Sequence, residues 1–156
     1  MMPKRHHVWW AYCVELLAAA ATLLALCLWF STPAVAGFVR NVALDIATLF
    51  GAVMLAASLG FLWAIYTKSD TEFYRWLDAR GAFRVYLYAT AYSVLVSLLS
   101  TLSLVALKQI TGEVFTIVAV FLLILALINL ITLVRNVVDL MLLNARFNHV
   151  RAGGKS

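Results

Sequence analysis

Four long runs of apolar residues alternate with short polar segments along this chain of 156 residues. A membrane-spanning helix needs about 20 mostly apolar residues to cross roughly 30 Å of hydrocarbon. Each run reaches that length, so the pattern predicts an all-α integral membrane protein with four transmembrane helices. The runs are Ala11–Phe30, Val42–Tyr66, Phe83–Leu107 and Val114–Val134. Because the linkers are short, residues 1–150 are expected to form a single four-helix transmembrane domain, followed by a disordered tail at 151–156.

Composition supports lipid as the surrounding medium. The chain is 65% hydrophobic and 12% charged, whereas a soluble domain is nearer half apolar and a quarter charged. The formal charge of +5 does not indicate nucleic-acid binding, which needs a contiguous basic face. Here the basic residues stand at the ends of the apolar runs, where they meet lipid headgroups.

The basic residues are also divided unequally between the two sides of the predicted membrane domain. Ten belong to the termini and the second linker, and only Arg40 and Lys108 belong to the other two linkers. The positive-inside rule therefore predicts that both termini are cytoplasmic. In a bacterium this describes a multi-pass protein of the inner membrane.

The segment that ends at Ala36 leaves an alternative open. A basic N-terminus, an apolar stretch and the small-residue triplet 34–36 resemble a signal peptide cleaved before Gly37. The apolar stretch is about 20 residues long, against the usual 7–15 or so, and it contains Glu15. Both features favour a retained helix. Cleavage would leave three spans.

The first two linkers carry local structure signals. Pro33 and Gly37 predict an irregular loop over 31–41. In the second linker, Ser69 and Glu72 have the spacing of a capping box, and Gly81 is placed to end the short helix that follows.

This short helix is expected to be amphipathic. Phe73, Trp76 and Leu77 share one face, whereas Arg75 points elsewhere. We expect the helix to lie on the cytoplasmic membrane surface. Its role is either to anchor the linker or to dock a cytoplasmic protein partner.

Small residues recur every four positions in the second and third runs. This spacing lets two helix backbones approach closely within a membrane. The stripes predict packing inside the bundle, packing between protomers, or a water-lined path, and the sequence does not choose among them. They comprise Ala52, Ala56, Gly60 and Ala64 in the second run and Ser93, Ser97 and Thr101 in the third.

The fourth run becomes polar on one side towards its cytoplasmic end. Its polar residues cover an arc of about 120° at 100° per residue. A polar stripe facing lipid is costly, so this one is expected to face protein or water. It is either a headgroup-level helix end or a seam that lines a pore or docks a partner. The residues are Asn129, Thr132, Arg135, Asn136 and Asp139.

Two acidic residues lie in or at the edge of the spans. Ionisable residues inside a membrane are functional candidates by default. Glu15 is about one turn inside the first run, with Arg135 as the expected counter-charge on the same side. Asp45 and Lys108 form the equivalent expected pair on the other side. Each carboxylate is either half of a structural ion pair or, for Glu15, a site of proton or cation exchange.

The segment Cys13-Val14-Glu15-Leu16 is similar to the membrane segment of small multidrug exporters that carries an essential glutamate. The similarity covers this one residue. It implies an alternative function, a proton-coupled exporter of cations or drugs that uses Glu15.

No motif of a catalytic, cofactor or metal site is recognisable. We therefore expect a non-enzymatic protein without cofactors, whose partners are membrane lipids, further copies of itself and a possible cytoplasmic protein. Short four-helix proteins that guard membranes against toxins, and membrane subunits of anti-phage systems, are similar in architecture, which is a likeness of fold only. Assembly by helix–helix contact, with pore formation as one mechanism, is the first expectation.

Overall fold

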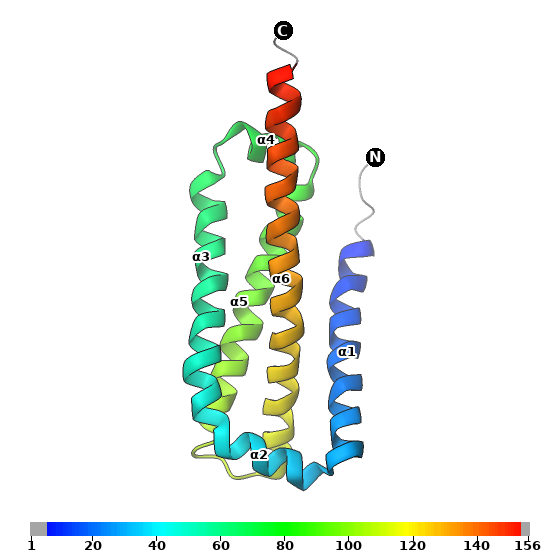
Figure 1. Cartoon of the computed structure of the whole chain (residues 1–156), viewed down its shortest axis with the longest axis vertical. Helices are drawn as coiled ribbons and strands as arrows, with labels where there is room; N and C mark the ends of the chain where they lie inside the picture. The colour runs from blue at the N-terminus through cyan, green and yellow to red at the C-terminus, as the bar shows by residue number, and fades with distance from the viewer. Residues whose placement is uncertain (1–5, 154–156) are drawn as a thin grey trace.

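A computed structural model describes residues 6–153, and every regular element in that range is helical. Figure 1 shows long helices running side by side, one short helix crossing one end and another at the opposite end. The elements are α1 (His6–Phe30), α2 (Thr32–Asp45), the π-helix η1 (Ile46–Gly51), α3 (Ala52–Lys68), α4 (Glu72–Ala79), α5 (Ala82–Ala106) and α6 (Glu113–Gly153). Helix α6 continues three residues into the expected tail, and residues 154–156 lie outside the described range.

The structure has four helical stretches that are long and apolar enough to cross a membrane, which confirms the expected number of spans. Most of their apolar surface faces outward. Only 11% of the apolar window of α1 is buried, and 44% of that of α6. Large side chains such as Leu28 and Trp29 are 79% and 85% exposed. Contiguous apolar surface of this extent is rare on soluble monomers, so these findings indicate a membrane protein.

The long helices pack side by side in the order α3, α5, α6, α1. Helix α5 packs against both α3 and α6, and α6 packs in turn against α1. Helix α1 begins towards the end of the molecule at which α4 lies and α6 finishes (Figure 1). The α5–α6 loop lies at the opposite end, together with α2. Residues 107–112 form the loop between α5 and α6, which corresponds to the short linker between the third and fourth apolar runs.

The prediction of an irregular loop over 31–41 is wrong, because helix α2 begins at Thr32 and covers the rest of this segment. The chain turns at Ser31, whose φ of 65° is the only positive value at a non-glycine residue in the described range. Pro33 then lies in the first helical turn, where its missing N–H has no intrahelical partner to lose. Helix α2 crosses the end of the molecule, and the chain bends at η1 to enter α3 (Figure 1).

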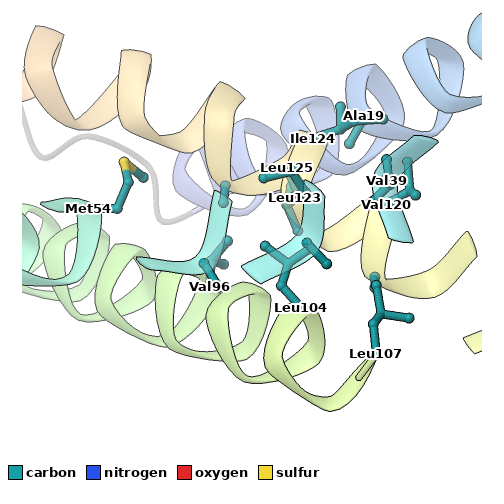
Figure 2. Close-up of a cluster of buried hydrophobic side chains, with 14 of the residues drawn as sticks. Ala19, Val39, Met54, Val96, Leu104, Leu107, Val120, Leu123, Ile124 and Leu125 are labelled. Atoms are coloured by element: carbon teal, nitrogen blue, oxygen red, sulfur yellow. The ribbon is translucent and has the colours of Figure 1, made fainter. Parts of the chain in front are cut away.

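The main apolar cluster joins α1, α2, α3, α5 and α6, and Figure 2 shows its side chains meeting around α6. Ala19 of α1 and Ala119 of α6 are fully buried in it. Gly51 lies so close to α5 that an added Cβ would lie 2.5 Å from Thr101 Oγ1. Small residues thus set the distances between the helices, as is usual in membranes.

Helix α4 forms where a short helix was expected, but the expected capping box is wrong. The N-cap is Thr71, and the Ser69 hydroxyl instead donates to Tyr66 O at 2.8 Å, near the end of α3. The expectation for Gly81 is confirmed. It has φ of 71°, a left-handed conformation that favours glycine, and it separates α4 from α5.

Candidate functional site

The most distinctive polar feature is a buried contact between α1 and α6. Glu15 is 8% exposed and Asn129 is 3% exposed. The Asn129 Nδ2 amide donates a hydrogen bond to Glu15 Oε2 at 3.2 Å. Ala19 and Ala126, one turn away on the same two helices, are also buried in the apolar cluster. Their small side chains allow the close approach that brings the carboxylate and the amide together.

Two tyrosines complete the surroundings of this carboxylate. Tyr12 of α1 and Tyr92 of α5 make an edge-to-face ring contact with centroids 4.7 Å apart. Tyr12 stands three residues before Glu15, on the same face of α1. The cluster Glu15–Asn129–Tyr12–Tyr92, called the Glu15 cluster below, therefore draws on three helices.

Two buried polar atoms of the Glu15 cluster have no hydrogen-bond partner among the residues that the structure describes. These are Asn129 Oδ1 and Tyr92 Oη. Buried polar groups are nearly always paired, so each unpaired atom needs an explanation. Asn129 Oδ1 can only accept a hydrogen bond, whereas the Tyr92 hydroxyl can both donate and accept one. The cluster therefore contains one unpaired acceptor and one unpaired hydroxyl.

Arg135 is not the partner of Glu15 that the sequence suggested. Arg135 is exposed on α6, and the hydrogen-bond partner of Glu15 is Asn129 instead. The rest of the α6 seam is divided. Thr132 is half-buried and donates to its own helix at Ile128 O, Asn136 is half-buried, and Asp139 is exposed. The five seam residues thus do not form one continuous surface.

At the opposite end of the molecule, Arg40 makes hydrogen bonds between elements. The sequence analysis had used this residue only to predict the orientation in the membrane. Arg40 Nη2 of α2 donates to Thr111 O at 2.6 Å and to Thr116 Oγ1 at 2.8 Å. These bonds join α2 to the start of α6. Asp45 and Lys108 are both exposed.

The two small-residue stripes lie in different environments. On α5, Ser93 and Ser97 are buried, at 3% and 1% exposure. The hydroxyls of Ser93, Ser97 and Thr101 donate to carbonyls four residues earlier on their own helix. This stripe therefore packs inside the protein.

The α3 stripe faces outward over most of its length. Ala52, Ala56 and Gly60 are exposed, and Ala64 is half-buried. Gly60 and Ala64 line an apolar groove between α3 and α6, opposite Val134 and Val138. The volume of the groove is about 510 Å³. A Cβ added at Gly60 would meet nothing within 4 Å.

The residues expected to dock a partner from α4 make contacts within the chain. Phe73 and Leu77 are buried against Leu140 of α6. They are therefore not free to contact a partner or the membrane surface. Arg75 donates through Nε and Nη2 to Asp70 O, at 3.0 and 2.8 Å.

The rest of α4 is held by contacts around its aromatic rings. The Arg80 guanidinium lies 3.7 Å above the ring of Trp76. Burial raises the pKa of Tyr74 above its usual value of 10, because the charged phenolate is poorly solvated there.

Comparison with known protein families, with curated protein sequences and with solved structures finds no match. Within the described residues, no three histidine, cysteine, aspartate or glutamate side chains gather as a metal site would require. The function must therefore be argued from the features above.

The sequence reasoning missed two members of the Glu15 cluster. Neither Tyr12 nor Tyr92 was among the expected site residues. Tyr12 stands three residues before Glu15 on one helix face, which is a signal that the sequence did contain. The contribution of Tyr92 depends on helix packing.

Proposed function

We propose that this is a non-enzymatic, multi-pass membrane protein that acts by helix–helix assembly with further copies of itself or with a partner. The observation that carries the proposal is the outward-facing small-residue stripe of α3. On the same helix Met54, Ser58 and Ile65 are buried, so α3 directs its other face into the protein. Small residues gain little contact with lipid but permit another helix to approach closely.

The α3–α6 groove supports the same proposal. It adjoins the stripe at Gly60, and its walls are almost entirely aliphatic, from Ala57 and Ala64 to Leu133 and Met141. Association of membrane helices depends on such close van der Waals packing. A helix of a second copy laid into this groove would bury the stripe and fill the groove at once.

The charge distribution supports an orientation with α4 and both termini in the cytoplasm. Lys68, Arg75, Arg80 and Arg84 belong to the α4 end, whereas Arg40 and Lys108 belong to the other. Such an imbalance in short linkers is what the positive-inside rule describes. For a bacterial protein we propose the inner membrane.

The experiment that tests assembly compares two glycines. Gly60 and Gly37 both lie in helices, and a Cβ at either would meet nothing within 4 Å. Gly60→Leu and Gly37→Leu should therefore both leave the monomer intact. Only Gly60 lines the groove.

We expect native mass spectrometry in mild detergent to show oligomers for the wild type and for Gly37→Leu, and mainly monomers for Gly60→Leu. A leucine side chain at the groove would keep a second helix from close approach, and we expect at least about tenfold weaker association, which is about 1.4 kcal/mol. A monomeric wild type, or an unchanged Gly60→Leu oligomer, would contradict assembly through this face.

Pore formation is the more specific version of this proposal. It requires Thr132, Asn136 and Asp139 to face a shared path in the assembly, since Asn129 is already bonded to Glu15. We expect Asn136→Leu to abolish any conductance in liposomes. Unchanged conductance would remove the α6 seam from the pore.

A second candidate is the proton-coupled exporter of cations or drugs. The specific observation in its favour is that Glu15 is buried and, among the described residues, has the neutral amide of Asn129 as its hydrogen-bond partner. On this proposal, drug resistance conferred by the protein should disappear in Glu15→Gln. Resistance that persists in that variant would exclude the role.

A further inference from the structure

We infer that a cavity between α4 and the start of α5 binds the headgroup of an anionic phospholipid through Arg75 and Arg84. The cavity has a volume of about 390 Å³, within the range of about 300–1,000 Å³ that is usual for ligand sites. Its lining comes from Ser69 after α3, from α4 and from the first two turns of α5. The inference requires that these helices lie in a membrane, and it depends neither on assembly nor on export.

The charged side chains of the cavity are not paired with one another. Arg75, Asp78 and Arg84 all line it, yet among the residues that the structure describes they form no ion pair. Two arginines and one aspartate give the lining a net charge of +1. A phospholipid whose phosphodiester is the sole charge of its headgroup is complementary to this cavity, because it brings the balancing negative charge.

Both arginines have N–H groups available to an anion. Arg75 Nε and Nη2 donate to Asp70 O at 3.0 and 2.8 Å, which holds the guanidinium in place. Arg75 Nη1 and the whole Arg84 guanidinium have no hydrogen-bond partner within residues 6–153. The planar guanidinium presents several N–H donors and is well suited to phosphate oxygens.

The apolar part of the lining favours a lipid over a free phosphate ion. The candidate membrane span of α5 begins at Ala82, so Arg84 belongs to its first turn. Leu87 and Tyr88 follow on the same face of α5, about 4.5–6 Å further along the helix axis. Tyr88 is 66% exposed, and tyrosine prefers the headgroup level of a membrane. The lining therefore passes from charged to apolar in the same direction as a phospholipid does.

The test measures lipid binding to the full-length protein, purified in mild detergent and freed of co-purified lipid. Native mass spectrometry records the complexes formed with equal concentrations of phosphatidylglycerol and phosphatidylcholine that carry the same acyl chains. Both lipids contain a phosphodiester, but only phosphatidylglycerol has a net negative charge. We expect the first lipid bound per chain to be phosphatidylglycerol by a ratio of at least about ten, as a charge-assisted hydrogen bond can provide.

Three substitutions at exposed positions separate the cavity from general surface charge. Arg84→Gln should lower the preference for phosphatidylglycerol about tenfold. Asp78→Asn removes the negative side chain and should raise the preference about two- to fivefold. Arg146→Gln makes the same change as Arg84→Gln on α6, outside the cavity, and should leave the preference unchanged. If Arg84→Gln does not fold, the opposite shift in Asp78→Asn decides.

Equal binding of the two lipids, or an unchanged preference in Arg84→Gln, would overturn the inference. Stronger binding of phosphatidylethanolamine than of phosphatidylglycerol would show a site for a zwitterion, and would overturn it as well. Inorganic phosphate and glycerophosphoglycerol, the headgroup without acyl chains, should not displace the lipid. Displacement by either would show a site for a free anion instead. Gly60→Leu should keep the lipid preference, so failure of assembly and failure of this inference are distinguishable.

Discussion

Gly51, the last residue of η1, provides a sharp test of the packing against α5 at the point where α3 begins. A Cβ at Gly51 would lie 2.5 Å from Thr101 Oγ1 and 3.0 Å from Thr101 Cγ2, both closer than ordinary van der Waals contact. Thr101 Oγ1 donates to Ser97 O at 2.8 Å, so rotating the threonine away breaks that bond. Gly51→Ala must therefore shift either Thr101 or the spacing between the helices.

The expected magnitude follows from two opposing terms. Overpacking of this kind costs about 1–3 kcal/mol, whereas replacing glycine by alanine inside a helix gains about 1 kcal/mol. We expect Gly51→Ala to lower the free energy of unfolding by up to about 2 kcal/mol. Gly37→Ala, where the new Cβ meets nothing within 4 Å, should be neutral or stabilising by up to about 1 kcal/mol.

The assay is unfolding in mixed micelles with increasing SDS, followed by tryptophan fluorescence, for both single variants and for Gly51→Ala/Thr101→Ala. In the double variant the nearest remaining atom of residue 101 is Cβ at 3.2 Å, which a small shift relieves. The double variant should recover at least half of the lost stability, which corresponds to a favourable coupling between the two sites. Equal stability of Gly51→Ala and Gly37→Ala, or no rescue by Thr101→Ala, would refute the proposed contact.

Three further predictions concern the two ends of the protein. Arg40→Gln should remove the hydrogen bonds to Thr111 and Thr116 and cost about 1 kcal/mol at this exposed position. Hydrogen exchange in the α5–α6 loop should then rise, and unchanged protection would argue against the tie. Leu77→Ala, at 1% exposure, should cost about 2–5 kcal/mol and release α4, which limited proteolysis between α3 and α5 would detect. Because the pKa of Tyr74 is raised by burial, its contribution to stability is fully present below pH 10 and is lost as the pH rises through its folded-state pKa. Alkaline unfolding should therefore shift to higher pH in Tyr74→Phe, and an identical pH profile would contradict this reasoning.

The number and approximate positions of the spans followed from the length of the apolar runs alone, because the bilayer imposes that length. Helix α2 did not follow. Pro33 and Gly37 are turn formers in water, but proline is tolerated in a first helical turn, and both residues are common in membrane helices. A rule drawn from soluble proteins therefore gave a loop where the chain is helical.

The two small-residue stripes show a second limit of the sequence. Ala56 and Gly60 on α3 have the same spacing as Ser93 and Ser97 on α5, yet the first pair is exposed and the second buried. Periodicity identifies a face of a helix but not the neighbour of that face. That choice depends on the order α3, α5, α6, α1, which arises from contacts between helices far apart in the sequence.

Two residues of the candidate site, Glu15 and Asn129, could be identified from the sequence, because polar residues within a span are costly and must find partners. Their pairing could not be derived, since an amide 114 positions away satisfies the carboxylate as the expected arginine would have done. Tyr92 was missed because one tyrosine in a span is an ordinary packing residue until its neighbours are known.

The central claim is that lipid surrounds these helices, with α4 and the α5–α6 loop on opposite sides of the membrane. Cysteine labelling tests it most directly. In a variant lacking Cys13 and Cys27, single cysteines at Asp70 and Gln109 report the two ends, since both positions are exposed. A membrane-impermeant maleimide applied to intact spheroplasts should label Gln109→Cys and not Asp70→Cys, and inside-out vesicles should give the reverse. Labelling of both positions from one side, or recovery of the protein in the soluble fraction, would contradict the account.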